Sequence, residues 1–147
     1  SQRTHDFLQE RLARFHNPSH ITFEIVESQS IDNKALLSEC IELLRSYGCQ
    51  IAIDDFGAGY SNFDYILSLS PDILKIDGSL IKDIDTNPKH RAIVENIHSL
   101  ARKLNIITVA EFVHSEAILA TLQKIGVDAV QGFYLDVPKA IEGTLAS

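Results

Sequence analysis

The sequence lacks the features that assign a chain to a membrane or to a nucleic-acid polymer. No apolar run approaches membrane-spanning length, and the segment from Ser1 to Phe15 has no apolar core typical of a leader peptide. No block of consecutive lysines or arginines occurs, and the formal net charge of -7 argues against a nucleic-acid backbone as the main partner. A small phosphate ligand is compatible with this charge, because a bound cation reverses it locally. We therefore expect a cytoplasmic segment without membrane contact, whether or not the parent protein carries an anchor.

Cysteine is scarce as well. Cys40 falls in a helical pattern and Cys49 opens a strand-like run, and neither belongs to a CxxC pair or to a histidine cluster with zinc-like spacing. We expect two reduced thiols that pack in the interior. The histidines show no metal spacing either, and we expect His90 and His98, on helical segments, to lie at the surface.

The residues that are present alternate between short runs rich in Ile and Val and longer segments with apolar residues at helical spacing. The strand candidates are residues 21–27, 50–56, 72–77, 106–112 and 129–138. The expected apolar helix faces are Leu8, Leu12 and Phe15; Leu36, Cys40, Leu43 and Leu44; Ile93, Ile97, Leu100 and Leu104; and Ile118, Leu119, Leu122 and Ile125. Pro88 and Ser115 are typical of helix starts, and Gly48 and Gly126 of helix ends. This alternation predicts an α/β fold of parallel β/α units, as an open sheet or a barrel.

Polar residues fall where these predicted strands end. They are Glu24, Glu27, Asp54, Asp55, Lys75, Asp77, Glu111 and Gln131. The carboxyl ends of parallel strands meet at one edge, so we expect these carboxylates to share one rim with a lysine and an amide. Asp77 either lies beside Lys75 or opens a turn. Any one of these acids alone could cap a helix or sit in water.

Acidic residues at four successive strand ends repel one another, and a cation relieves that cost. Oxygen ligands without Cys or His favour Mg²⁺ or Mn²⁺ over zinc. Asp54 and Asp55 point to opposite sides if their strand is regular, which suits two ions about 4 Å apart in phosphoester hydrolysis. From the residues alone, a Mg²⁺-dependent barrel enzyme acting on a phosphate or carboxylate substrate competes with a purely structural acidic rim.

Five segments, in order, resemble the second half of an EAL domain, the bacterial cyclic di-GMP phosphodiesterase family. They read FEIVES, IAIDDFGAGYSN, DILKIDGSLI, TVAEFV and DAVQGFYLDVP. The resemblance runs from about Asp6 to Pro138. It implies that residues 1–147 are the C-terminal part of a single TIM-type (β/α) barrel domain, with about five strands present. The activity that it implies is hydrolysis of cyclic di-GMP to linear pGpG in bacterial second-messenger signalling.

The resemblance also implies roles for individual residues. Glu24, Asp54 and Asp55 match metal ligands, and Glu111 matches a glutamate of the site that serves the metal and the chemistry. Lys75 matches the lysine beside the nucleophilic water, and Gln131 matches a glutamine near the metals and the water. Glu27 matches the glutamate that steadies the loop after Asp55.

Two departures from the family pattern stand out. Where the family reads A-E-G-V-E, this chain reads Ala110-Glu111-Phe112-Val113-His114, so that His114 replaces an acid and alters the charge near the site. The family's Glu-Ala-Leu and Asn-Leu-Ser segments, which supply two further metal ligands, would precede Ser1.

A full barrel of this class needs about 250 residues and eight strands. We therefore expect an incomplete two-metal site, a fragment that is inactive by itself, and association with a second copy or with the other part of the barrel. The competing function is a degenerate EAL module that binds cyclic di-GMP as a receptor without cleaving it. The retained site residues favour the enzyme for the parent protein.

Overall fold

The computed structural model describes residues 22–26, 34–58, 63, 68–132 and the backbone of 135–140. The first predicted helix, at Leu8 to Phe15, and the loop residue Glu27 lie outside these ranges. In the described part of the chain, no helix is both long and apolar enough to cross a membrane.

Five strands follow one another in chain order in a parallel sheet. They are β1 (Thr22–Val26), β2 (Gln50–Phe56), β3 (Ile73–Ile76), β4 (Ile107–Ala110) and β5 (Ala129–Gly132). The predicted parallel β/α fold is therefore confirmed.

The last predicted strand, residues 129–138, is two strands instead of one. After β5 the chain reverses, and β6 (Leu135–Ala140) pairs with it in the antiparallel direction. Gly132 ends β5 at a close approach of two backbones, because a Cβ atom there would lie 2.0 Å from the carbonyl oxygen of Val113. The alternation of apolar residues runs across this reversal and conceals it.

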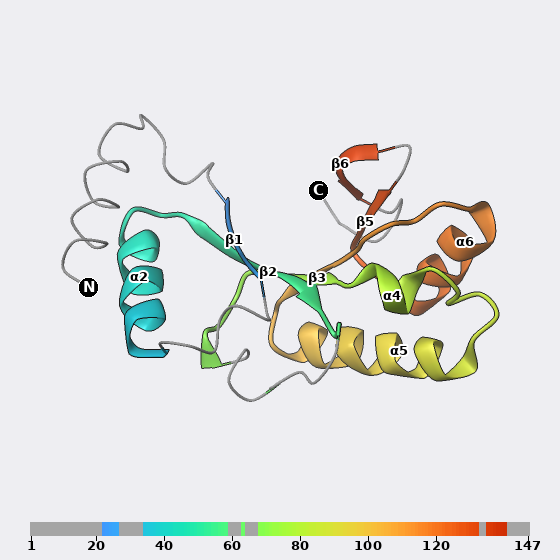
Figure 1. Ribbon diagram of the computed structural model, residues 1–147, viewed down its shortest axis with the longest axis horizontal. Coiled ribbons are helices and arrows are strands. Elements are labelled where there is room, and N and C mark those ends of the chain that lie inside the picture. The colour runs from blue at the N-terminus through green and yellow to red at the C-terminus, as the bar shows by residue number, and fades with distance from the viewer. Residues whose placement is uncertain (1–21, 27–33, 59–62, 64–67, 133–134, 141–147) are drawn as a thin grey trace.

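Four described helices accompany the strands. They are α2 (Lys34–Ser46), α4 (Gly78–Ile81), α5 (Pro88–Lys103) and α6 (Glu116–Ile125), and α2, α5 and α6 lie in chain order around the strands (Figure 1). The expected helix signals are in place: Pro88 follows the cap Asn87, and the Ser115 hydroxyl accepts a hydrogen bond from the Ile118 amide at 3.2 Å. Gly126 closes α6 with a φ of 96°, a left-handed conformation that glycine adopts without strain.

The core lies between the sheet and these helices. Fully buried side chains of β2 and β3, such as Ile51, Ile53 and Leu74, form its centre. Cys49 is buried and Cys40 partly buried, and both are free thiols, as expected.

Helix α5 packs through a face that differs from the predicted one. Ile97 is buried as expected, but Ile93, Leu100 and Leu104 are exposed, and the other buried residues are Val94, His98 and Ala101. The expectation that His98 lies at the surface is therefore wrong: its exposed fraction is 7%, and its ring is hydrogen-bonded to Thr108. The buried residues follow the helical spacing i, i+3, i+4, i+7, but one of them is a polar histidine. The larger aliphatic residues Ile93 and Leu100 lie next to Val94 and Ala101 in the sequence and suggested the wrong face. His90 is only partly exposed and pairs with Asp83 at 2.6 Å.

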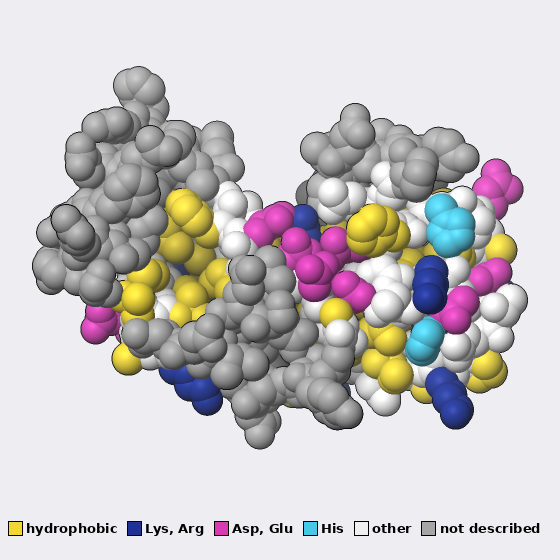
Figure 2. All heavy atoms as spheres, viewed as in Figure 1, with side chains coloured by type: hydrophobic (Ala, Val, Ile, Leu, Met, Phe, Trp, Pro, Cys, Tyr) yellow, Lys and Arg dark blue, Asp and Glu magenta, His cyan; other side chains and the backbone are white. Residues whose placement is uncertain are grey.

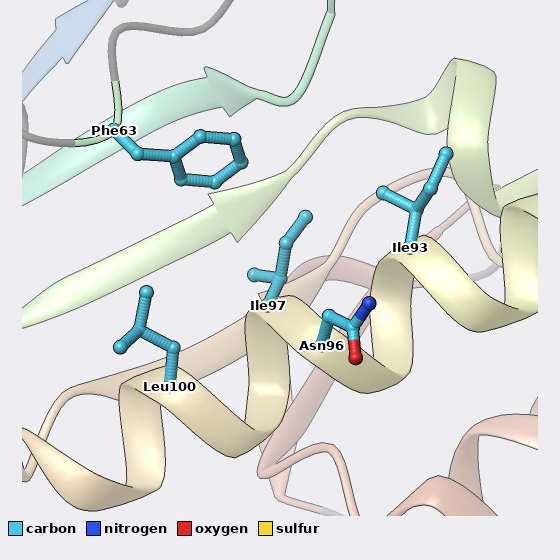
Figure 3. Close-up of a pocket in the computed structure, with 5 residues that line it drawn as sticks. All are labelled: Phe63, Ile93, Asn96, Ile97 and Leu100. Atoms are coloured by element: carbon cyan, nitrogen blue, oxygen red, sulfur yellow. The ribbon is translucent and has the colours of Figure 1, made fainter.

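The exposed apolar residues of α5 line a shallow cleft. It has a volume of about 350 Å³ and lies between Phe63 and the helix residues Ile93, Asn96, Ile97 and Leu100 (Figure 3). Phe63 stacks edge-on against the buried ring of Phe56, with ring centroids 5.0 Å apart.

Candidate metal centre

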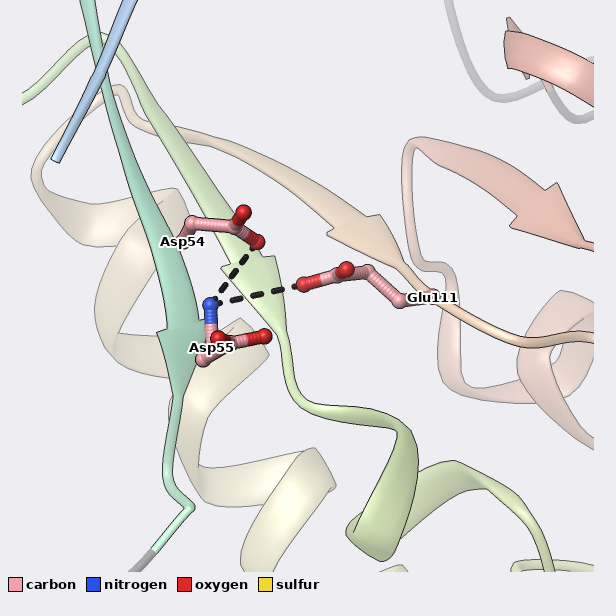
Figure 4. Close-up of side chains that lie close together, drawn as sticks. All are labelled: Asp54, Asp55 and Glu111. Atoms are coloured by element: carbon pink, nitrogen blue, oxygen red, sulfur yellow. Dashed lines mark hydrogen bonds between the residues drawn. The ribbon is translucent and has the colours of Figure 1, made fainter. Parts of the chain in front are cut away.

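The end of strand β2 is irregular, and this irregularity builds the site. The register with β3 shifts between Ile53 and Phe56, and Asp55 has a φ of 53°, which is unusual for a residue with a side chain. The strand is therefore not regular here, and the condition under which Asp54 and Asp55 would point to opposite sides is not met. The bulge brings both carboxylates to the same place, where oxygen atoms of Asp54, Asp55 and Glu111 lie within 4.8 Å of one another (Figure 4).

Glu111 reaches this cluster from the end of β4. Its amide donates to the Ile76 carbonyl at 3.2 Å, which extends the pairing with β3 by one residue beyond the strand. Its carboxylate then faces the bulge, where the Asp55 amide donates to Asp54 Oδ1 at 2.9 Å and, at a longer 3.4 Å, to Glu111 Oε1 (Figure 4).

The crowding of carboxylates shifts their protonation. Burial, together with the hydrogen bond and negative charge of Asp54, raises the pKa of Glu111 to about 8. Burial, followed by the charges of Asp54 and Asp77, also raises the pKa of Asp55. Without a cation, the cluster therefore holds a proton near neutral pH.

Lys75 and Glu24 form an ion pair beside the cluster. Lys75 projects from β3 with an exposed fraction of only 8%, and its Nζ donates to Glu24 Oε1 on β1. Glu24 also lies close enough to Asp55 to raise the pKa of that carboxyl. Acidic side chains and a basic one accordingly gather near the middle of the face in Figure 2.

Gln131 carries an unsatisfied buried group. Its backbone carbonyl accepts a hydrogen bond from the Val113 amide at 3.1 Å, but its side-chain Oε1 is buried and has no hydrogen-bond partner among the described residues. A buried amide oxygen without a partner costs free energy unless a water or a ligand satisfies it.

Two further residues have local roles. The Asp77 carboxylate caps α4 by accepting from the Ser79 amide at 2.9 Å, which favours the turn over a partnership with Lys75. His114 is exposed, and its Nδ1 lies 3.2 Å from the Phe112 carbonyl oxygen.

Sequence reasoning missed the strain at Phe112. This residue, next to Glu111, is 59% exposed with a φ of 58°, and its ring covers Gly78 so closely that a Cβ there would clash. The family pattern has glycine at this position, and that replacement was the available signal.

The residues present fit a hard divalent cation. Three carboxylates converge, and burial together with the hydrogen bond and charge of Asp54 raises the pKa of Glu111, a cost that a bound cation would relieve. Oxygen donors of this kind suit Mg²⁺, Mn²⁺ or Ca²⁺.

The fold and site define a class of protein: a parallel β/α domain with a cluster of carboxylates that could hold a metal ion at the carboxyl ends of its strands. The family model that describes the EAL domain matches residues 1–138. The chain belongs to the EAL domain family.

Named relatives agree with this assignment. The chain is 40% identical to the probable cyclic di-GMP phosphodiesterase PdeA of Escherichia coli, with 87% of this chain and 18% of that protein covered. It is 38% identical to the cyclic di-GMP phosphodiesterase PdeB of Shewanella oneidensis, with 82% and 14% covered. The chain thus spans less than a fifth of these relatives.

Solved structures share the fold. Klebsiella pneumoniae BlrP1, in a complex with manganese and cyclic di-GMP, superposes with a TM-score of 0.81 at 31% identity, covering 92% of this chain and 34% of that one. The PaMucR phosphodiesterase in complex with cyclic di-GMP gives a TM-score of 0.79 at 36% identity, covering 95% and 57%.

Proposed function

We propose that this chain forms part of a metal-dependent phosphodiesterase that hydrolyses cyclic di-GMP to the linear dinucleotide. The observation that carries the proposal is the convergence of Asp54, Asp55 and Glu111, with oxygens within 4.8 Å of one another. The names of the relatives and the ligands of the solved structures support the choice of substrate.

Asp54, Asp55 and Glu111 would hold Mg²⁺ or Mn²⁺, with Glu24 as a further ligand. When bound, two such ions lower the pKa of a water and stabilise the leaving oxygen of a phosphodiester. Manganese in the BlrP1 complex supports this choice of metal.

Lys75 supplies the positive charge nearest to the reaction. Its burial and its ion pair with Glu24 hold Nζ in one place, so that it is ready to orient an attacking water or a phosphoryl oxygen without reorganisation. With a cation held by Glu24, Lys75 Nζ would be available to contact the substrate.

Glu111 and Gln131 complete the chemistry. Glu111 combines its proposed place at the metal with that of a proton acceptor, because its carboxylate lies within the cluster and can take a proton from a water there. The unpartnered Oε1 of Gln131 accepts a hydrogen bond from a water or a substrate hydroxyl.

We also propose that the chain works as the C-terminal part of a single EAL-type barrel. It covers 34% and 57% of the two solved chains above, and the described sheet runs from β1 to β6 as an open order. The remaining metal ligands would then come from the other part of the barrel or from association with it.

The experiment measures conversion of cyclic di-GMP to linear pGpG with Mn²⁺, together with nucleotide binding, for the wild type and for Glu24→Gln. Metal-dependent product that disappears in Glu24→Gln supports the enzyme. Binding without product, both in this chain and after the other part of the barrel is added, supports the receptor. Neither binding nor product in the completed barrel contradicts the proposal.

A further inference from the structure

The four parallel strand pairs differ in the length of their regular ladders, and two of them are short. Strands β1 and β2 align over five register pairs, and β3 and β4 over four. In contrast, β2 and β3 keep only two pairs before the bulge, and β4 and β5 have two in all. Asp54 lies on the first of these short pairs, beside the strand of Lys75, and Glu111 follows β4 of the second, beside the strand of Gln131. The point at which each ladder begins therefore bears on the relative height of these side chains.

An aspartate closes the base of the first short ladder. Asp72 directly precedes β3, its amide donates to the Ile51 carbonyl at 2.8 Å, and its carboxylate accepts from the Ile51 amide at 2.8 Å. The two residues therefore bond reciprocally across the strands. The Asp72 carbonyl also accepts from the Ile107 amide at 3.0 Å, which joins β4 to the same point.

A second aspartate repeats the arrangement at the base of the second short ladder. Asp128 directly precedes β5, and its buried carboxylate accepts from the Thr108 amide at 2.9 Å. The Asp128 amide lies 3.3 Å from Thr108 Oγ1, and that hydroxyl donates back to Asp128 Oδ2, also at 3.3 Å. His98 Nδ1 lies 2.9 Å from the same hydroxyl, in a hydrogen bond whose direction is set by the tautomer of the ring.

The spacing above the two aspartates is the same. Lys75 is the third residue after Asp72, and Gln131 is the third residue after Asp128. On the partner strands, Asp54 is the third residue after Ile51, and Glu111 is the third after Thr108. Each bonded pair thus lies three residues below two side chains of the candidate site.

We propose that Asp72 and Asp128 are positioning residues that set the register of β2 with β3 and of β4 with β5, and so the relative height of the site residues. A one-residue slip in either pair turns the opposing side chains to the other face of the sheet. The carboxylate of the residue that precedes each strand prevents this slip, because it accepts a hydrogen bond from an amide of the neighbouring strand where the ladder begins. The effect on catalysis rests on the proposed function, whereas the effect on register does not.

The test compares Asp128→Ala and Asp128→Asn in the full chain. Asparagine keeps an acceptor oxygen and alanine removes it, so the pair separates the hydrogen bond from the carboxylate charge. Asp72→Ala and Asp72→Asn repeat the comparison at a less buried position, in case Asp128→Ala does not fold. Ile41→Val, in the buried face of α2, is the control for a general loss of stability.

Amide exchange followed by NMR measures how firmly the hydrogen bonds between each pair of strands are held. In Asp128→Ala, we expect exchange at Val113, whose amide donates to Gln131, to accelerate about tenfold more than exchange in α2. In Asp72→Ala, we expect the same at the Asp77 amide, which donates to the Phe56 carbonyl at 3.0 Å between the ends of β3 and β2. Both asparagine variants should stay close to the wild type. Equal acceleration at all amides, as in Ile41→Val, overturns the proposal.

Mn²⁺ affinity, measured by electron paramagnetic resonance, shows whether the change in register weakens the metal site. Each alanine variant should bind Mn²⁺ about tenfold more weakly, and each asparagine variant should remain within about threefold of the wild type. If the variants show selective exchange but the wild type binds no Mn²⁺ even after the other part of the barrel is added, the proposed function fails and the register proposal stands. If the wild type binds Mn²⁺ and the alanine variants bind it equally well, the positioning role is overturned.

Discussion

Replacing Glu111 by glutamine should stabilise the protein in the absence of metal, and only at neutral to alkaline pH. The pKa of Glu111 is raised from 4.5 to about 8, so the folded protein favours the protonated side chain. A raised carboxyl pKa contributes stability that is complete below about pH 4.5 and is lost as the pH rises through about 8. Glutamine is neutral throughout and escapes this loss.

The size of the expected stabilisation follows from the difference between the two pKa values of Glu111. At about 1.4 kcal/mol for each pH unit, the difference between 4.5 and about 8 sets an upper bound of about 5 kcal/mol. Glu111 is only partly buried, and solvent screening reduces the expected gain to about 2 kcal/mol. Below about pH 4.5, Glu111→Gln and the wild type should have the same free energy of unfolding.

The assay is urea unfolding with a chelator at about pH 5 and about pH 9. Glu42→Gln, an exposed change on α2, controls for the loss of one negative charge. Saturating Mn²⁺ should then stabilise the wild type more than Glu111→Gln, because the metal binds the folded state. If Glu111→Gln at about pH 9 is no more stable than Glu42→Gln, the reasoning about the crowded carboxylates is refuted.

Three further changes test other parts of the structure. Lys75→Met should lower cyclic di-GMP turnover in the completed barrel about a hundredfold or more but change Mn²⁺ affinity much less, and an equal loss of both would contradict a role at the phosphoryl group. Phe112→Gly should be about 1 kcal/mol more stable to urea than Phe112→Ala, because both changes remove the ring but only glycine adopts a positive φ without strain. Equal stabilities of the two variants would refute the claim that the backbone at Phe112 is strained. Burial lowers the pKa of His98 below 6.5, so wild-type stability is present above that value and is lost as the pH falls through the folded-state pKa. His98→Gln should reduce that loss, and an unchanged pH dependence would show that the pKa of His98 is the same in the folded and unfolded protein.

Much of the fold could be predicted because its signals are local. The caps at Asn87 and Ser115, the left-handed Gly126 and the Ile-rich strands each act within a few residues, and the parallel order follows from their alternation. The reversal from β5 to β6 could not be predicted, because it depends on the approach of Gly132 to Val113, which is distant along the chain.

The positions of the candidate site residues at strand ends could be predicted, but their geometry could not. Strand ends located Asp54, Glu111 and Lys75, since the carboxyl ends of parallel strands share one edge. The bulge that turns Asp55 toward Asp54 is a tertiary feature and breaks the two-residue period on which the sequence argument relied. The prediction that His98 lies at the surface failed for a related reason. A histidine is buried only when its ring nitrogen has a hydrogen-bond partner, and that partner, Thr108, lies on another element.

The central claim is that Asp54, Asp55 and Glu111 form a divalent metal centre. The most direct measurement is Mn²⁺ binding to the chain at about pH 8, by electron paramagnetic resonance, with Asp54→Asn and Glu42→Gln compared side by side. We expect the wild type and Glu42→Gln to bind Mn²⁺ alike, and Asp54→Asn to lose most of that affinity. Equal binding by all three would contradict a metal centre at this cluster.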